Sequence, residues 1–360
     1  MNYIKMFSLF LFGKFLSITA VYSILTEVPC DHQTLIHQSP YRVLGIGSSM
    51  VDLIIHVDED FLLNVPGEKG GSQILSFNDL QNIVKNSEKN PKITTGGSSA
   101  NTIKGLANLG VPCAFLSFIG TDSYGDFFHS TFKQLKIVPL FTKSILPTSQ
   151  VLCLITPDGQ RTMRSFQGSS QEMSERFLHP DYFKNIELLL IDGYTVRNEK
   201  LTLTAMQLAK SMGAKISFDL SSFELVRQYK DFMMHLLNDY VDIVFANEDE
   251  ILALTGLSPV DGCKELQKKC DVAVVLMGNQ GCLVGHQGSV THYPTIPTSV
   301  VDSTGAGDLF ASGFIFNYLE NKSLDECANL GNLLGMEIIQ VEGGSDLPEC
   351  KWNQLKAEKL

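Results

Sequence analysis

The chain has 360 residues, a formal net charge of −11, 44% hydrophobic residues and 19% charged residues. This length suits one large α/β domain or two ordinary ones, and the composition is that of a globular protein. The acidic balance argues against nucleic acid as the main partner, because binding to a phosphate backbone requires a basic face. The 8 cysteines form no Cys-x-x-Cys pair and no zinc-like cluster, which indicates reduced thiols in a cytoplasmic protein.

Residues 1–40 form an apolar N-terminal segment that differs from the rest of the chain. Residues 6–25 are apolar apart from Lys14 and a few hydroxyl residues. A charge inside a membrane helix costs about 2.5–3.5 kcal/mol, and the segment matches a secretory cleavage site only tolerably. We expect a dispensable extension, with an anchor or a signal peptide as alternatives. Membrane contact is expected only if residues 1–40 act as an anchor.

From residue 42 onward, short apolar runs alternate with helical patterns at 201–212 and 249–255. The predicted strands cover 42–47, 186–192, 215–219, 242–246 and 272–277. Buried runs that alternate with helices predict a three-layer α/β/α fold with a doubly wound, mainly parallel sheet. Ligands of such sheets bind beyond the carboxyl ends of the strands. The polar or glycine residues predicted at those ends are Asp192, Asp219, Asn247, Gly278 and Asp302.

Two strand-like segments, 52–58 and 150–166, break this alternation. The second contains Asp158-Gly159 between two strand-like runs, which is a hairpin signal. Together they predict a small antiparallel β lid, built from about 52–76 and 138–167, over the ligand edge of the sheet. The first segment also excludes a dinucleotide-binding motif at 45–50, because the third glycine is missing and a strand follows instead of a helix.

Residues 302–308, with the sequence Asp-Ser-Thr-Gly-Ala-Gly-Asp, lie between an expected strand end and a helix. The amides of Gly305, Ala306 and Gly307 at a helix start would form an anion hole. A carboxylate at 308 repels a bound anion unless it has another task. The economical task is to take a proton from a hydroxyl group that attacks a phosphoryl group. Taken alone, a capped helix with Asp308 complementing the dipole is an equal alternative.

This motif resembles the second signature of the PfkB (ribokinase-like) family of sugar and nucleoside kinases. Other motifs of that family occur in the same order at 96–101, 119–125, 247–250 and 278–281. Leu276 and Met277 depart from the family, which commonly has Thr or Ser before the glycine of the last motif. The resemblance covers about residues 41 to 345. It implies a ribokinase-like kinase domain, placed at 41–350, with a β lid.

The resemblance also implies roles for individual residues. The predicted catalytic residues are Asp308, Gly305, Ala306 and Gly307, and the predicted substrate-binding residues are Asp52, Gly96, Gly97 and Asn101. Predicted nucleotide-binding residues are Asn247, Gly278, Gly281, Thr304 and Asn332, with Glu250 contacting Mg²⁺ through water. The open structural alternatives are a capped strand end for Asp52, a capped helix start for Asn247 and Glu250, and an exposed helix position for Asn332. Arg161 and Arg164 of the hairpin either reach phosphate or lie on a solvated strand face.

The stretches 45–52 and 192–194 look most like the adenosine-kinase-like branch of the family. We therefore expect transfer of the γ-phosphoryl of ATP to a primary hydroxyl group of a nucleoside, with adenosine and its 5′-hydroxyl as the leading candidate. The apolar residues expected to bury the base are Phe61, Leu62, Leu63, Val65, Val151, Cys153 and Ile155.

Several alternatives stay open. A ribose or fructose kinase and an inactive sugar-binding regulator are the other readings within the family, and a dinucleotide-dependent oxidoreductase is disfavoured by the missing third glycine. ATP and Mg²⁺ are the expected cofactors, with a monovalent cation such as K⁺ left open. A homodimer through the lid is also left open.

Overall fold

The computed structural model describes residues 41–343 and 346–359, so the predicted extension at 1–40 lies outside the described residues. A nine-stranded sheet with the order β14-β13-β12-β11-β10-β9-β1-β5-β6 forms the centre. The strands from β12 to β6 run parallel, and the β12-β13-β14 edge is antiparallel. Their bounds are β1 (Val43–Ile46), β5 (Cys113–Gly120), β6 (Val138–Ser144), β9 (Leu188–Asp192), β10 (Lys215–Asp219), β11 (Ile243–Asn247), β12 (Val272–Leu276), β13 (Cys282–His286) and β14 (Ser289–Tyr293).

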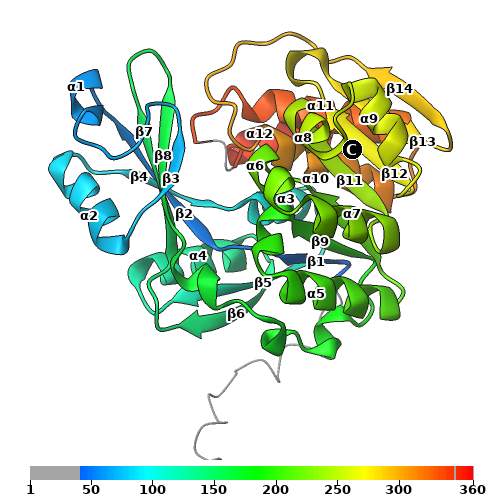
Figure 1. The fold of residues 1–360 in the computed structure, drawn as a ribbon, viewed down its shortest axis with the longest axis horizontal. Coiled ribbons are helices and arrows are strands. Elements are labelled where there is room, and N and C mark those ends of the chain that lie inside the picture. Colours follow the sequence, from blue (N-terminus) through cyan, green and yellow to red (C-terminus); the bar gives the residue numbers. More distant parts are fainter. Residues whose placement is uncertain (1–40, 344–345, 360) are drawn as a thin grey trace, which may run out of the picture. The chain divides into compact units, whose positions relative to one another are not determined.

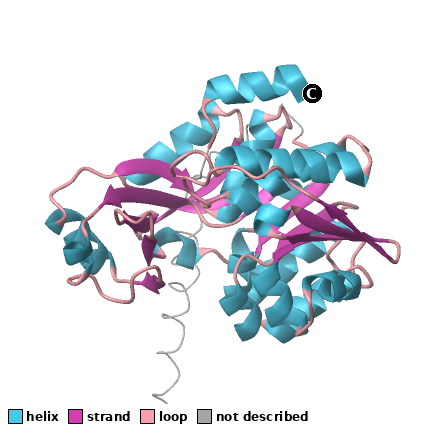
Figure 2. Cartoon of the chain, turned by 90° about the horizontal axis from the view of Figure 1, so that it is seen from above, coloured by secondary structure: helices cyan, strands magenta, loops and turns pink. Residues whose placement is uncertain are grey.

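Helices cover both faces of this sheet (Figures 1 and 2). One face carries α5 (Glu199–Ser211), α6 (Phe223–Gln228), α7 (Lys230–Asp239), α8 (Glu248–Thr255) and α9 (Pro259–Leu266). The other carries α3 (Ser98–Asn108), α4 (Ser123–Gln134), α10 (Ala306–Leu319) and α11 (Leu324–Ile338). Successive strand residues point to opposite faces, so Val43 joins one core and Leu44 the other. The predicted three-layer α/β/α fold is confirmed.

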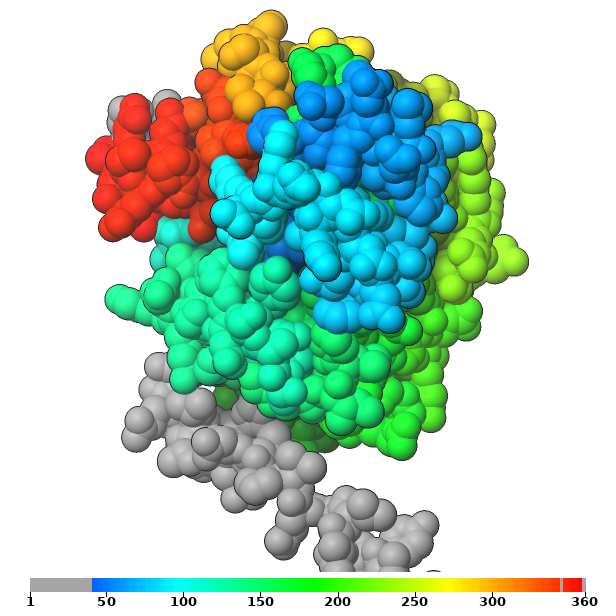
Figure 3. All heavy atoms as spheres, turned by 90° about the vertical axis from the view of Figure 1, so that its left-hand side faces the viewer, coloured from blue at the N-terminus to red at the C-terminus, as the bar shows by residue number. Residues whose placement is uncertain are grey.

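A second sheet of five strands, with the order β3-β8-β7-β2-β4, forms a lid beside the main sheet (Figure 1). Its strands are β2 (Met50–His56), β3 (Ser72–Ile74), β4 (Lys92–Gly96), β7 (Ser149–Ile155) and β8 (Arg161–Phe166), accompanied by α1 (Glu59–Leu62) and α2 (Phe77–Asn86). Figure 3 looks onto this side, where the blue and cyan segments meet the orange and red C-terminal segments.

The lid differs from the prediction in pairing and in extent. The β7-β8 hairpin is antiparallel as expected, but β2 pairs with β7 in parallel, and so does β3 with β8. The reason is that β2 follows β1 and β7 follows β6, two parallel strands that leave the main sheet at the same edge. Residues 138–144, which were predicted as lid, form β6 of the main sheet, whereas the lid gains β4.

The C-terminal helix α12 (Glu349–Lys359) lies beyond the predicted domain end at residue 350. Its Trp352 and Leu355 are buried in a cluster with Leu334 and Ile338 of α11. Packing of this kind makes α12 part of the domain rather than a tail. Within the described residues, no helix is long and apolar enough to span a membrane.

Candidate active site

Asp308 lies in the first turn of α10 and is held by two side chains of α3. Ser98 Oγ donates to one carboxylate oxygen at 2.7 Å, and Asn101 Nδ2 donates to the other at 2.8 Å. The two helices approach closely at Gly105, where an added Cβ would lie 2.3 Å from Ser312 Oγ. This close crossing fixes the Asp308 carboxylate at the carboxyl edge of the parallel strands.

Burial raises the pKa of Asp308 to about 6, against the hydrogen bonds from Asn101 and Ser98 that favour the charged form. The nearby Asp192 carboxylate raises this pKa further, and the Lys104 ammonium lowers it. A general base works best when its pKa lies near the operating pH. A carboxylate with a pKa in this range can accept a proton close to neutrality.

Asp52 on lid strand β2 packs against Gly96 at the end of β4. A Cβ at Gly96 would lie 2.3 Å from Asp52 Oδ2, so only glycine leaves room for the carboxylate there. Burial raises the pKa of Asp52 to about 6, Lys104 and Arg161 lower it, and Asp308 raises it. The predicted substrate residue of the lid and the predicted base of the main domain thus share one electrostatic environment.

Two buried polar atoms beside these carboxylates have no hydrogen-bond partner among the described residues. They are Asn101 Oδ1 and Thr94 Oγ1, and Thr94 stands opposite Asp52 in the β2-β4 register. An unpaired buried polar atom is costly, so such atoms usually mark a site that a ligand or water completes. Their positions suit a ligand with several hydroxyl groups.

The predicted anion hole is the start of α10. Gly305 has φ +73° at the N-cap, a left-handed conformation that glycine adopts without steric cost. Asp302 accepts hydrogen bonds from the backbone N–H groups of Thr304 at 2.9 Å and Gly343 at 2.8 Å. Arg161 of lid strand β8 forms an ion pair with Asp302. The lid is thereby bonded to the anion-hole loop itself.

Further carboxylates gather at the neighbouring strand ends. Burial, together with the nearby charges of Glu250 and Asp308, raises the pKa of Asp219 well above its usual range. Burial likewise raises the pKa of Glu250 to about 7. Buried carboxylates that repel one another are a suitable environment for a hydrated cation. Within 41–343 and 346–359, no group of three or more His, Cys, Asp or Glu residues is placed to hold a metal ion.

Asn247 and Glu250 form the capping box of α8. The Asn247 backbone N–H and Nδ2 donate to the two Glu250 carboxylate oxygens at 2.9 and 2.8 Å, and Glu250 N–H donates to Asn247 Oδ1. Asn247 and Glu250 therefore cap the start of the helix, as the structural alternative expected. In this arrangement Asn247 is exposed and Glu250 is buried close to Asp219.

The predicted nucleotide loop follows β12. Gly278 opens an exposed turn, and a Cβ at Gly281 would lie 2.1 Å from the Tyr293 carbonyl oxygen. Leu276 lies just before this loop. A Cβ added at Gly307, in the predicted anion hole, would lie 3.4 Å from the Leu276 side chain. The loop and the anion hole are therefore adjacent.

Asn332 lies on α11 and is buried rather than exposed. Its Nδ2 donates to the Tyr293 carbonyl oxygen at 3.0 Å, which braces the chain after β14. It also lines a cavity of about 610 Å³ together with Thr295, Phe316 and Met336. Within the described ranges, the side-chain hydrogen bonds of Asn332 go to the carbonyl oxygens of Tyr293 and Pro294, and none reaches Asp308.

Some residues that the sequence suggested for ligand binding instead support the fold. Arg164 is buried and donates to the backbone carbonyl oxygens of Pro66, Gly71, Met163 and Glu68, so it neither faces solvent nor reaches the anion hole. Cys153 and Ile155 are buried against Ile54. Of the other residues predicted to contact a nucleoside base, Phe61, Leu62 and Val65 pack in the hydrophobic core. Leu63 is exposed and Val151 is half-buried.

Sequence reasoning did not single out Ser98, Thr94 or Lys104. Ser98 lies inside the motif at 96–101, so its place in the motif was a usable signal. Lys104 follows Asn101 by three residues, a spacing that puts both on one face of a helix. Thr94 gave no signal, because its position depends on the pairing of β4 with β2.

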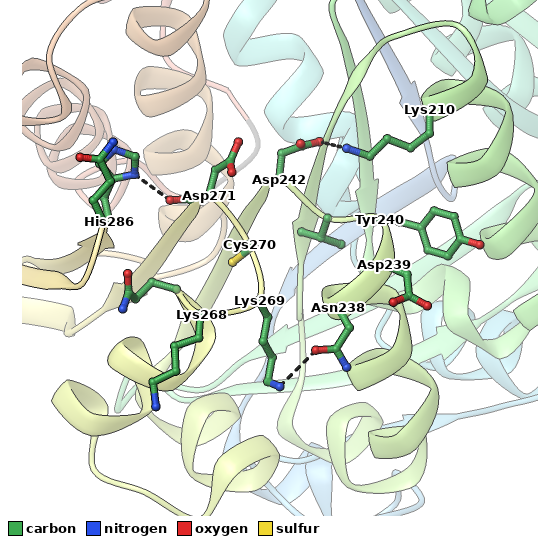
Figure 4. A pocket seen from close by; sticks show the side chains of 13 residues that line it. Lys210, Asn238, Asp239, Tyr240, Asp242, Lys268, Lys269, Cys270, Asp271 and His286 are labelled. Atoms are coloured by element: carbon green, nitrogen blue, oxygen red, sulfur yellow. Dashed lines mark hydrogen bonds and ion pairs between the residues drawn. The ribbon is translucent and has the colours of Figure 1, made fainter.

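A second cavity, of about 480 Å³, lies at the amino ends of β11 and β12 (Figure 4). Its polar groups bond with one another: Lys210 with Asp242, Lys269 with Asn238, and His286 with the Asp271 carbonyl oxygen. Ligands of parallel sheets bind at the carboxyl ends of the strands. This cavity is therefore not the candidate active site.

Comparisons with known proteins agree on the class of protein. The profile described as "pfkB family carbohydrate kinase" matches residues 71–350. A crystal structure of adenosine kinase from Sinorhizobium meliloti is similar with a TM-score of 0.81 and 28% identity, covering 89% of this chain and 100% of that one. Adenosine kinase of Schizosaccharomyces pombe is 26% identical over 335 residues, covering 85% of this chain and 96% of the relative. Ribokinase of Haemophilus influenzae is 26% identical over 272 residues, covering 72% and 86%.

Proposed function

The chain belongs to the pfkB family of carbohydrate kinases, and on that premise we propose that it transfers the γ-phosphoryl group of ATP to a primary hydroxyl group of a nucleoside. The observation that carries the proposal is the Asp308 carboxylate at the start of α10, beside the amides of Gly305, Ala306 and Gly307. A phosphoryl group on those amides would lie next to a base able to deprotonate the attacking hydroxyl group. Phosphoryl transfer needs mainly such positioning and charge neutralisation.

Each part of the site has a separate task in this mechanism. Asp52 accepts hydrogen bonds from the vicinal hydroxyl groups of the sugar, and Asn101 Oδ1 and Thr94 Oγ1 use their free bonding capacity on the same ring. Asp308 takes the proton from the primary hydroxyl group. Mg²⁺, held through water near Asp219 and Glu250, would neutralise phosphate charge when bound. Family members use ATP and Mg²⁺ in general, and the cytoplasm, which supplies ATP, is the proposed location.

The chemistry of one lid face supports a nucleoside over a free sugar. A single row of register partners crosses all five lid strands on the face that bears Asp52: Thr94, Asp52, Val151, Ser165 and Ile74. The row is polar at its β4 end and largely apolar at its β3 end. Ile74 is 56% exposed, and Met163, two residues from Ser165 on the same face, is 37% exposed.

An exposed apolar surface next to a diol-binding carboxylate suits a molecule with a sugar and a flat base. Burying apolar area contributes roughly 25 cal/mol per Å², which a free sugar would not supply. Because the same surface would also serve a homodimer contact through the lid, which the sequence leaves open, binding of the base needs a direct test.

A competition assay tests the proposal. The chain is supplied with adenosine, ribose and fructose together, with limiting ATP and Mg²⁺, and the phosphorylated product is identified. The proposal predicts a nucleoside 5′-monophosphate as the main product. Phosphate found only on the free sugars would instead support the ribose or fructose kinase alternative, which the similarity to ribokinase keeps open. If none of the acceptors is phosphorylated, the alternative of an inactive sugar-binding protein is favoured.

A further inference from the structure

Lys104 is a lysine in the middle of α3 that is only 1% exposed. Its Nζ donates to the Thr95 carbonyl oxygen at 2.7 Å and to Thr95 Oγ1 at 3.1 Å. Both acceptors are neutral, and no ion pair of Lys104 is formed within the described ranges. A buried ammonium is costly unless nearby charge compensates for it. Carboxylates at longer range offer such compensating charge.

The carboxylates that face Lys104 include the two central groups of the site. Burial lowers the pKa of Lys104, while Asp346, Asp52 and Asp308 raise it. In the reverse direction, Lys104 lowers the pKa of both Asp52 and Asp308. One buried cation therefore lies within electrostatic reach of the substrate carboxylate of the lid and of the base on α10.

Lys104 also joins two elements whose relative position defines the site. Thr95 lies on lid strand β4 directly before Gly96, against which Asp52 packs. Lys104 lies on α3, one helical turn beyond Asn101, which bonds to Asp308. The ammonium thus bridges the short connection between the lid and α3.

We propose that Lys104 is a positioning residue of this site: its buried ammonium holds β4 to α3 and supplies the positive charge that the carboxylates of Asp52 and Asp308 share. The role toward Asp308 as a base rests on the proposed function. The sharing of charge between Lys104 and the two carboxylates does not depend on the proposed function. It can be measured by protein stability, without an activity assay.

The first test is the pH dependence of kcat/KM in Lys104→Met and Lys104→Arg. The charged and titratable groups that face Asp52 or Asp308 include Lys104, Arg161, Cys153, Asp192, Asp219, Asp302 and Tyr194. Among these, Lys104→Met removes only the central cation. We expect the acid limb to move upward by about one pH unit or more, since loss of a nearby cation disfavours the carboxylate form. Lys104→Arg should keep the limb near its wild-type position.

Arg164→Met is the matched control, because Arg164 of lid strand β8 is also a fully buried cation, and its hydrogen bonds among the described residues all go to backbone carbonyl oxygens. Its loss should leave the acid limb in place. A Lys104→Met enzyme that is slower at every pH, with an unmoved acid limb, would contradict the proposal.

The second test measures unfolding by urea at pH 8 for Lys104→Met, Asp52→Asn and the double variant. We expect Asp52→Asn to raise the urea midpoint more in the Lys104→Met background than in the wild-type background. Equal effects in both backgrounds would contradict charge sharing. If Lys104→Met does not fold, recovery of folding in the double variant supports the proposal and its absence contradicts it. This test still decides the role of Lys104 if the wild type proves to have no kinase activity.

Discussion

At the scale of single residues, two carboxylates of one loop differ in their environments. Asp302 is buried, but the N–H groups of Thr304 and Gly343 and the ion pair with Arg161 hold its pKa below the usual range. Asp308, six residues on, has a pKa raised to about 6 by burial. When the environments of two neighbouring carboxyl groups give them very different pKa values, the two groups usually have different roles, one structural and one in proton transfer. Asp302 stays charged and holds the loop, whereas Asp308 can exchange a proton.

Asp52→Ala tests the role of the lid carboxylate. If Asp52 accepts hydrogen bonds from both hydroxyl groups of a ribose, its loss should raise KM for a ribosyl substrate by about 10–100-fold, the scale of bonds to a charged group. A 2′-deoxy substrate should then lose most of its disadvantage, because the acceptor that it fails to satisfy is gone. The measurement is KM for both substrates.

Asp58→Ala is a suitable control, because Asp58 is an exposed lid residue without a side-chain capping bond. It should leave both KM values close to those of the wild type. Equal KM increases for the ribose and deoxyribose substrates in Asp52→Ala would place Asp52 outside the pocket.

The sequence motifs and their resemblance to the pfkB family pointed to Asp308, Asn101 and Asp52, and the structure brings these residues together. The sequence could not indicate that Ser98 would share Asp308 with Asn101. That contact depends on how closely α3 approaches α10, which is set by Gly105 and Ser312 on two distant segments. Local patterns report which side chains are available, while contacts between helices depend on tertiary packing.

At the scale of elements, the site depends on how the lid meets the main domain. The ion pair between Arg161 and Asp302 bonds the lid to the anion-hole loop. His56 Nε2 and Glu342 Oε1 lie 2.5 Å apart, and Lys92 Nζ donates to the Glu342 carbonyl oxygen at 2.9 Å. These contacts join lid strands β2, β4 and β8 to the segments beside α10. The position of the lid and the geometry of the loop before α10 are therefore linked.

Arg161→Met tests this link. Without the ion pair the lid should close less completely, so water should reach the phosphoryl group more often. We expect the rate of ATP hydrolysis relative to transfer to rise several-fold, while the acceptor KM also rises. Both rates are measured in the same reaction, from total ADP and from phosphorylated acceptor.

Lys89→Met serves as the control, because Lys89 is an exposed cation whose Nζ bonds to the His56 carbonyl oxygen, away from Asp302. The ratio should not change in this variant. If hydrolysis and transfer fall in proportion in Arg161→Met, the ion pair has no part in excluding water.

Most predicted strands of the main sheet lie within a residue or two of their observed bounds, because continuous apolar runs identify buried parallel strands. The lid was harder to predict. β6 was assigned to the lid and β4 was not predicted, since the sheet that a strand joins depends on its partners and not on its own residues. β5 was not predicted, although its uninterrupted apolar run carried the usual signal.

At the scale of the whole molecule, several carboxylates with raised pKa values gather at one edge of the sheet, namely Asp52, Asp192, Asp219, Glu250 and Asp308. A group whose pKa is higher in the folded state contributes stability below its unfolded pKa and loses it as the pH rises through the folded value. For Asp308 this window runs from about pH 4 to just above 6. The folded protein thus gives up stability near neutral pH to keep these groups together.

Asp308→Asn should therefore make the protein more stable at pH 8. Each pKa unit corresponds to about 1.4 kcal/mol, and partial exposure reduces the effect, so we expect a gain of about 1–2 kcal/mol that disappears below about pH 4. Urea unfolding at pH 4 and pH 8 measures the difference.

Asp302→Asn should show the opposite sign, since the pKa of Asp302 is lowered in the fold and its charge contributes stability above the unfolded pKa. An Asp308→Asn protein that is less stable than the wild type at pH 8 would show that its carboxylate is a structural group.

The most direct measurement is kcat of Asp308→Asn at saturating acceptor and ATP, made beside the affinities for both. If Asp308 is the base of a phosphoryl transfer, kcat falls by about 10²–10⁴, the usual contribution of a general base, while both affinities stay within several-fold of the wild type. A kcat close to that of the wild type, with the acceptor and ATP bound normally, would contradict the assignment.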